Sequence, residues 1–197
     1  AIISLALGGL FGVVLVAVAQ MWWALVVGAA AIAAAWFYTG GRKPYGYLGL
    51  GELFVFVFFG LVAVNGTALA ITGRPSWAAL LASVAIGLLA VALMLTNNLR
   101  DIPTDAVSGK RTLAVRLGER GTRLLYTTTL LAPFVLMVPV IIAHWPAALV
   151  LLALPLAIGP VRKVLGGAMG RDLIPVLGAT GRLELVFSLL LLVGLVL

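Results

Sequence analysis

The chain has 197 residues, of which 63% are hydrophobic and only 10% are charged, and its formal net charge is +7. A soluble domain of this size cannot bury so much apolar surface, so the composition predicts a protein that spans a lipid bilayer several times. The chain has no cysteine and one histidine, which excludes disulfides, thiolate metal sites and histidine clusters.

Seven apolar runs follow one another along the chain, each near the ~20 residues that a helix needs to cross a bilayer. They cover residues 1–20, 23–39, 51–71, 77–97, 124–143, 147–161 and 173–197. The run 147–161 is the weakest candidate, because it is short and contains Pro155, which should kink a helix. We therefore expect an all-α, polytopic transmembrane helix bundle with seven spans, in a single domain over residues 1–197.

The loops between these runs alternate sharply in charge. In the expected arrangement every Lys and Arg except Arg74 falls on one side of the membrane. Cytoplasmic loops keep Lys and Arg, so we expect this side to face the cytoplasm across the cell's inner (plasma) membrane. Membrane topology thus accounts for the positive charge, and no nucleic-acid partner is expected.

The segment "TNNLRDIPTDAVSGKR" (residues 96–111) concentrates polar residues at the end of the fourth run. Asn97, Asp101 and Asp105 are spaced by four, so they would share one face of a helix, although Pro103 should make that helix bend or restart. Two neighbouring carboxylates repel each other unless a cation lies between them. Without Cys or further His, the natural candidate is a hard ion such as Mg²⁺.

Four cations surround this acid pair, namely Arg100, Lys110, Arg111 and Arg116. Together they would suit a diphosphate that is bridged by the metal. The alternative is a solvated loop whose acids cap helices and whose cations only set the topology.

A second segment on the same side, "YTGGRKPYGYLGLGE" (residues 38–52), combines glycines, tyrosines and two cations. Glycines allow a ligand to approach the backbone closely, Arg42 and Lys43 could bind diphosphate oxygens, and the tyrosine rings could line a pocket. The alternative is a flexible turn with charges that set topology. In the seventh run, Arg182 and Glu184 are ionisable residues at depth, which usually face the bundle interior or a wet cavity, and we favour a structural pair. Residues 110–123 could form an amphipathic surface helix that acts as a lid or as an anchor.

Two of these stretches resemble a known family. "NNLRDIPTDAVSGKRTLAVRLG" is similar to the second aspartate-rich motif of the UbiA superfamily of intramembrane prenyltransferases, and is closest to its 1,4-dihydroxy-2-naphthoate polyprenyltransferase branch, which serves menaquinone synthesis. "YTGGRKPYGYLGLGELFVFVFFG" resembles the loop and following helix of the same branch. The resemblance implies that Asp101 and Asp105 hold Mg²⁺ against a polyprenyl diphosphate, with Asn97 beside them.

The resemblance also implies further contacts to the diphosphate. Lys110 and Arg111 would bind it. Tyr38 matches the tyrosine of the family's Tyr-x-x-x-Lys element, in which Arg42 stands at the lysine position and Lys43 follows.

Members of this superfamily have nine transmembrane helices around a cavity that is open to the membrane, with the active site at its cytoplasmic end. This chain has seven apolar runs, begins at Ala1 inside such a run, and has no acidic residue before Glu52. By resemblance, we expect the C-terminal part of the fold, N-terminally incomplete, without the first two helices and the first aspartate-rich motif.

The implied reaction is Mg²⁺-dependent transfer of a polyprenyl group from an allylic diphosphate to 1,4-dihydroxy-2-naphthoate, with decarboxylation to demethylmenaquinone. Two alternatives remain open. One is a sister prenyltransferase that uses 4-hydroxybenzoate, homogentisate or haem as acceptor. The other is a membrane transporter, which would place charges and broken helices at mid-membrane depth rather than at one edge.

Overall fold

The computed structural model describes residues 2–41 and 44–197, and every regular element in these two ranges is a helix. In chain order the elements are α1 (Ile2–Ala19), α2 (Trp23–Thr39), η1 (Tyr45–Leu48), α3 (Gly51–Val55), η2 (Phe56–Asn65), α4 (Gly66–Thr72), α5 (Trp77–Val107), α6 (Leu113–Leu136), α7 (Val138–Ala143), η3 (Trp145–Ala153), α8 (Pro155–Leu165), η4 (Gly170–Leu173) and α9 (Ile174–Val196). Of the η elements, η2 is a π-helix and the others are 3₁₀-helices. The expected all-α class is confirmed.

Length and composition support fewer membrane spans than the seven apolar runs suggested. Four continuous helices are long and apolar enough to cross a bilayer: Gly51–Thr72, Trp77–Val107, Leu113–Ala143 and Gly170–Val196. A fifth span results if η3 and α8, which meet at an angle of 40°, are counted together. The remaining two helices, α1 and α2, are apolar but shorter.

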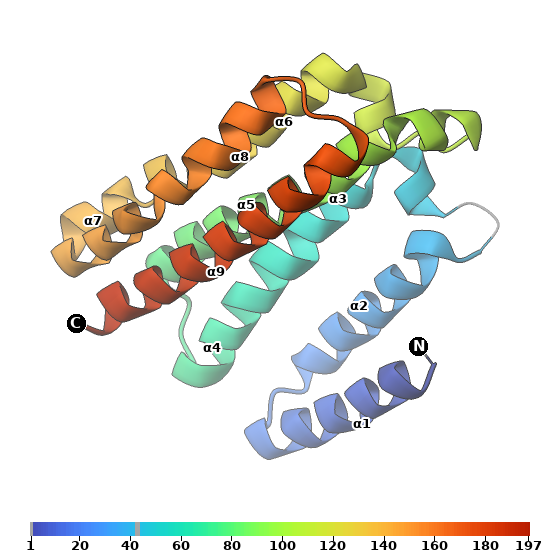
Figure 1. The fold of residues 1–197 in the computed structure, drawn as a ribbon. Helices are drawn as coiled ribbons and strands as arrows, with labels where there is room; N and C mark the ends of the chain where they lie inside the picture. Colours follow the sequence, from blue (N-terminus) through green and yellow to red (C-terminus); the bar gives the residue numbers. More distant parts are fainter. Residues whose placement is uncertain (1, 42–43) are drawn as a thin grey trace.

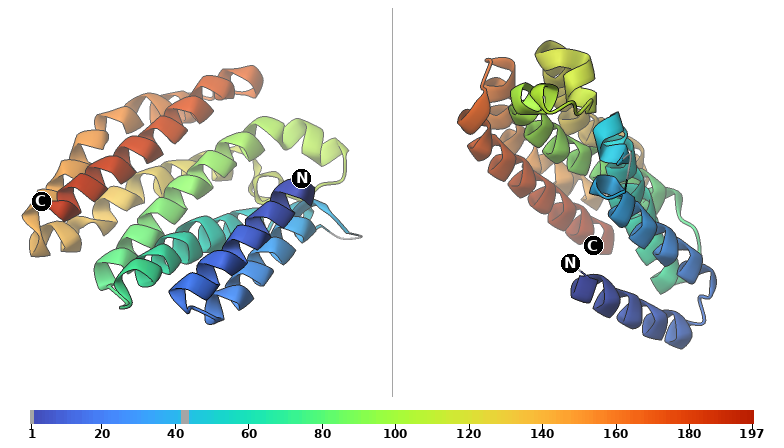
Figure 2. Two further views of the ribbon diagram at one scale, coloured as in Figure 1. Left: turned by 90° about the horizontal axis from the view of Figure 1, so that it is seen from below. Right: turned by 90° about the vertical axis from the view of Figure 1, so that its right-hand side faces the viewer.

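Helix α5 forms the centre of the bundle, where it packs against α6, η2 and α9 (Figure 1). Its residues Ala85, Leu89, Ala92 and Leu95 are fully buried. They recur every three or four residues, which is the spacing that keeps side chains on one face of a helix. By contrast, α2 has no buried residue, and α1 and α2 lie along one side of the bundle (Figures 1 and 2).

The cation-bearing loops that follow α5 and α8 lie at the same end of the bundle, where α2 also ends (Figure 1). We call this end the cation-rich end. At the opposite end, Arg74 stands in the turn between α4 and α5. The arrangement matches the alternation of charge along the sequence.

Three bends or breaks in the helices decide the course of the chain near the cation-rich end and beyond. Helix α5 continues through Pro103 to Val107 rather than restarting, and its last turns bend away from the axis of the preceding part (Figure 2), as proline favours. Gly118 interrupts α6 with φ 66° and ψ 178°. The expected surface helix over 110–123 is therefore only the short piece Leu113–Leu117. The expected kink at Pro155 is the bend between η3 and α8.

Candidate active site

A cavity of about 920 Å³ lies between α2, α5, α9 and the continuous helix Gly51–Thr72, which comprises α3, η2 and α4. Its wall is mostly apolar and aromatic, with Phe54, Phe58 and Met94 among the lining residues. The polar side chains in the wall are Tyr38, Tyr45, Asn97 and Glu184. A smaller cavity of about 350 Å³ lies at the opposite end, around Arg74 and Trp77, and it is remote from the acid pair.

Asn97 connects the large cavity to the cation-rich end. It lines the cavity, and Asp101 and Asp105 follow it by one and two turns on α5. Because residues four apart lie above one another on a helix, the three side chains start from one face of α5. The predicted stripe is therefore present, and its acids lie beyond the polar end of the cavity.

Asp101 is held by its chain neighbour Arg100. The guanidinium donates two hydrogen bonds, from Nε to Oδ1 at 2.7 Å and from Nη2 to Oδ2 at 2.8 Å. Both side chains are about one-third exposed, at 33% for Arg100 and 38% for Asp101. The pair is bidentate, which is the strongest form of such a contact.

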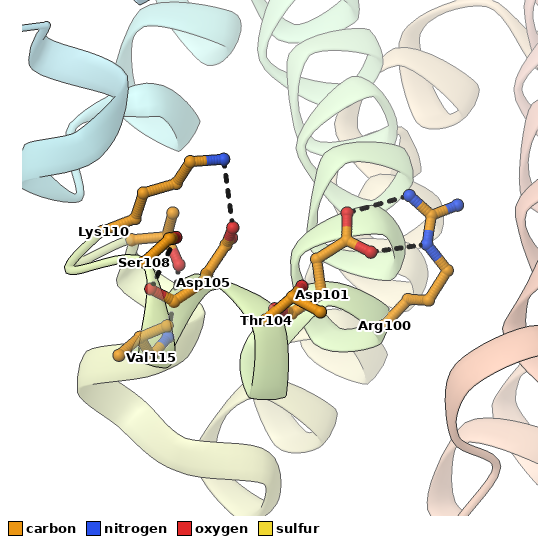
Figure 3. Close-up of polar contacts among 8 residues, drawn as sticks. Arg100, Asp101, Thr104, Asp105, Ser108, Lys110 and Val115 are labelled. Atoms are coloured by element: carbon orange, nitrogen blue, oxygen red, sulfur yellow. Dashed lines mark hydrogen bonds and ion pairs between the residues drawn. The ribbon is translucent and has the colours of Figure 1, made fainter.

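Asp105 is paired with a different cation. It is only 8% exposed, and its Oδ1 lies 3.2 Å from Nζ of Lys110. The hydrogen bond that Lys110 donates to Asp105 raises the pKa of the Lys110 side chain. Figure 3 shows the two carboxylates turned toward separate cations, so in this structure each acid has its own counter-charge.

The two segments singled out in the sequence lie against each other at this end. The backbone N–H of Arg111 donates to the carbonyl of Tyr47 at 2.9 Å, and Nζ of Lys110 lies 5.0 Å from the centre of the Tyr47 ring. Gly49 has φ 76°, and a Cβ there would lie 3.1 Å from the Arg111 carbonyl oxygen. Docking of the first loop on the second thus requires glycine at this position.

The remaining expected site residues are placed as follows. Tyr38 lines the cavity beside Tyr45, with their ring centroids 5.6 Å apart. The Arg111 side chain is exposed, and Arg116 donates from Nε to the Arg111 carbonyl at 3.1 Å. Arg42 and Lys43 lie outside the described residues.

Two acidic residues have environments that the sequence did not indicate. Glu52 is 5% exposed and accepts a hydrogen bond from Nδ2 of Asn98 at 2.7 Å, while its Oε2 is buried without a hydrogen-bond partner among the described residues. Glu184 faces the cavity, and Arg182 is exposed. No ion pair joins Glu184 and Arg182 among the described side chains, so the expected structural pair is not formed. The available signal was an acidic residue within an apolar run.

The acids at the cation-rich end offer only oxygen ligands. Within the part of the chain that the structure describes, no group of three or more acidic or histidine side chains could hold a metal ion. Two carboxylates with an amide nearby still suit Mg²⁺, because this ion keeps several waters and takes further ligands from substrate phosphates. The donor chemistry at Asp101 and Asp105 therefore fits such an ion.

Comparison with known proteins agrees with the family resemblance of the two sequence segments. A model described as the UbiA prenyltransferase family matches residues 1–169. The 1,4-dihydroxy-2-naphthoate octaprenyltransferase of Mycobacterium tuberculosis is 50% identical over 189 residues, covering 96% of this chain and 64% of that protein. The protein of the same name from Mycobacterium leprae is 50% identical over 167 residues, covering 85% and 57%. The one from Escherichia coli is 43% identical over 139 residues, covering 68% and 45%. The chain thus spans less than two-thirds of the length of these relatives.

Proposed function

Because the chain belongs to the UbiA prenyltransferase family, we propose that its protein transfers a polyprenyl group from an allylic diphosphate to 1,4-dihydroxy-2-naphthoate. Carbon dioxide is lost from the attacked carbon, and the product is a demethylmenaquinone in its reduced form. The observation that carries this proposal is the 50% identity over 96% of the chain to a protein named as a 1,4-dihydroxy-2-naphthoate octaprenyltransferase.

The cavity suits this reaction on physical grounds. Ionisation of an allylic diphosphate yields a carbocation that water would destroy, so the reacting carbon needs a dry environment. The cavity has a volume of about 920 Å³, and its wall is mostly apolar and aromatic. It can therefore hold a hydrocarbon chain and exclude water. The acids and cations lie beyond its polar end, where the diphosphate would remain.

The charged residues have distinct roles in this proposal. Asp101 and Asp105 would hold Mg²⁺, with Asn97 beside them, and the ion would supply positive charge to the departing diphosphate. Arg100 and Lys110, which pair with these acids, would bind diphosphate oxygens, as would the exposed Arg111. Tyr38 at the cavity wall, together with Arg42 and Lys43, completes the proposed diphosphate site.

The membrane location follows from the same reasoning. The helices of membrane length make this a multi-pass membrane protein. We place it in the inner (plasma) membrane with the cation-rich end toward the cytoplasm, because Lys and Arg are retained on that side. Soluble dihydroxynaphthoate and the diphosphate head would then reach the site from the cytoplasm.

The test is a transfer assay with the purified full-length protein, Mg²⁺ and a polyprenyl diphosphate. Dihydroxynaphthoate is compared with 4-hydroxybenzoate, homogentisate and haem, and we expect turnover with dihydroxynaphthoate alone. Asp101→Asn and Asp105→Asn should each lower kcat by roughly 100-fold or more, since charge stabilisation of the leaving group is lost. Asp172→Asn serves as control, because Asp172 is an exposed acid in η4 at the same end. Turnover with another acceptor, or full activity of both site variants, would refute the proposal.

A further inference from the structure

Glu184 is an ionisable residue that the proposed function has not used. It lies within α9, a helix of membrane length, and its side chain faces the cavity. Ionisable groups inside membrane segments are costly and usually serve a site. Arg182, two residues earlier, is exposed, so Glu184 is not explained by a neighbouring counter-charge.

The position of Glu184 along the cavity follows from its neighbours. A Cβ at Gly181 would lie 3.3 Å from Cδ1 of Leu93, so α9 and α5 touch at these two residues. Helix α9 starts at the cation-rich end, whereas α5 ends there (Figure 1). Glu184 follows this contact along α9 and therefore lies deeper in the bundle, whereas Asn97 follows it along α5 and lies nearer the cation-rich end.

The side chain of Glu184 reduces this separation. Side chains on a helix lean toward its N-terminus, and the N-terminus of α9 is at the cation-rich end. The carboxyl group thus leans toward the end of the cavity that Asn97, which also lines it, approaches. A bicyclic aromatic acid placed below the acid pair would lie beside the Glu184 carboxyl group.

The chemistry of the two substrates decides which one Glu184 meets; this step rests on the proposed function. A polyprenyl chain is a hydrocarbon and forms no hydrogen bond with a carboxyl group. The diphosphate and the naphthoate carboxylate are anions, so an ionised Glu184 would repel them. The hydroxyl groups of dihydroxynaphthoate remain, and each can donate a hydrogen bond. We propose that Glu184 binds the acceptor through its hydroxyl group next to the attacked carbon and takes the proton of that group.

The proton transfer balances without any further reactant. The diphosphate first leaves with the electron pair of its C–O bond, which yields the allylic carbocation. As the hydroxyl proton then moves to Glu184, the ring's electron pair forms the bond to the cationic carbon. The carboxylate then departs as carbon dioxide, and the electron pair of its C–C bond restores the aromatic ring. Glu184 returns the proton to the ring oxygen, so it is unchanged over the cycle.

The first test uses steady-state kinetics of the full-length protein with dihydroxynaphthoate and farnesyl diphosphate. Glu184→Gln should lower kcat/KM for the acceptor by about 100-fold, the usual contribution of a general base, and leave KM for the diphosphate unchanged. Glu184→Asp should recover part of the activity. Arg182→Gln is the matched control on the same helix and should behave like the wild type.

The second test separates acceptor contact from a structural role. Equilibrium binding of dihydroxynaphthoate is compared with that of its 1-methoxy analogue, which lacks the proton in question. The wild type should prefer the hydroxyl compound, and Glu184→Gln should bind both alike while still binding farnesyl diphosphate. Unchanged acceptor kinetics in Glu184→Gln, or an equal loss of activity in Arg182→Gln, would overturn this inference but not the proposed function. An inactive wild type would overturn the proposed function and this inference with it.

Discussion

Arg123 is a buried cation in a chain whose other cations mostly lie at the surface of one end. It is 8% exposed, and its Nη1 donates to the carbonyls of Val164 at 2.6 Å and Ala168 at 2.9 Å. Val164 belongs to the last turn of α8, whose carbonyls lack partners within the helix. Arg123 therefore caps α8 and ties it to α6, while Glu119 provides its counter-charge at 3.2 Å.

Arg123→Met should destabilise the bundle by about 2–4 kcal/mol, because one buried and one partly buried carbonyl lose their donor. The midpoint of thermal unfolding in detergent would fall measurably. Arg120→Met is the control, since Arg120 is exposed on the same helix and should change the midpoint little. Equal midpoints for the two variants would show that the cap contributes nothing to stability.

Residue-scale contacts differ in how far they could be predicted. The stripe of Asn97, Asp101 and Asp105 depends only on the period of one helix, and the sequence alone indicated it. The bond from Asn98 to Glu52 joins residues 46 apart, and that from Arg123 to Val164 joins residues 41 apart. Such pairs depend on which helices meet, which one sequence does not reveal. For the same reason Glu184 was paired with its near neighbour Arg182 rather than with the cavity.

At the scale of elements, η2 and α5 approach each other closely at a pair of glycines. A Cβ at Gly60 would lie 2.6 Å from Cα of Gly87 and 2.6 Å from the carbonyl oxygen of Ser83. Glycine thus lets the two backbones touch, as small residues do between membrane helices. A hydrogen bond from Asn65 to Ser83, at 2.6 Å, holds the same pair of helices together. This contact fixes one wall of the cavity against α5.

Gly60→Ala should therefore lower stability by about 1–3 kcal/mol, because the added methyl group forces the helices apart. We also expect weaker acceptor turnover, since the cavity wall would move. Gly66→Ala in the same continuous helix, Gly51–Thr72, is the control, because a Cβ there meets nothing within 4 Å. Thermal unfolding and transfer assays on both variants check this; a Gly60→Ala protein as stable as Gly66→Ala would argue against the close contact.

The course of the helices was predictable where proline or apolar length decided it, and less so elsewhere. The bend at Pro155 and the bend of α5 near Pro103 follow from the missing N–H and the bulky ring. The break at Gly118 was not anticipated, because glycine is also tolerated inside helices. Of the seven expected spans, four or five are formed by described helices of sufficient length and apolar composition, while α1 and α2 are apolar but shorter.

At the scale of the whole molecule, the distribution of charge sets the orientation. The cation-bearing loops that follow α5 and α8 lie together at one end, and the turn between α4 and α5, whose sequence includes Arg74, lies at the other (Figure 1). Retention of Lys and Arg in the cytoplasm would place the acid pair on the inner side. The chain contains no cysteine, so a single introduced thiol can report on either end without competing sites in this segment.

Ser108→Cys and Arg74→Cys provide such reporters, since both positions are exposed in turns at opposite ends. We expect a membrane-impermeant maleimide to label Arg74→Cys in intact cells, and Ser108→Cys only after permeabilisation. The full-length protein is used, with any cysteine outside this chain replaced by serine. Labelling of Ser108→Cys from the outside would invert the orientation. The acid pair would then face away from a diphosphate made in the cytoplasm, so this outcome would also remove the proposed route of the substrate to its site.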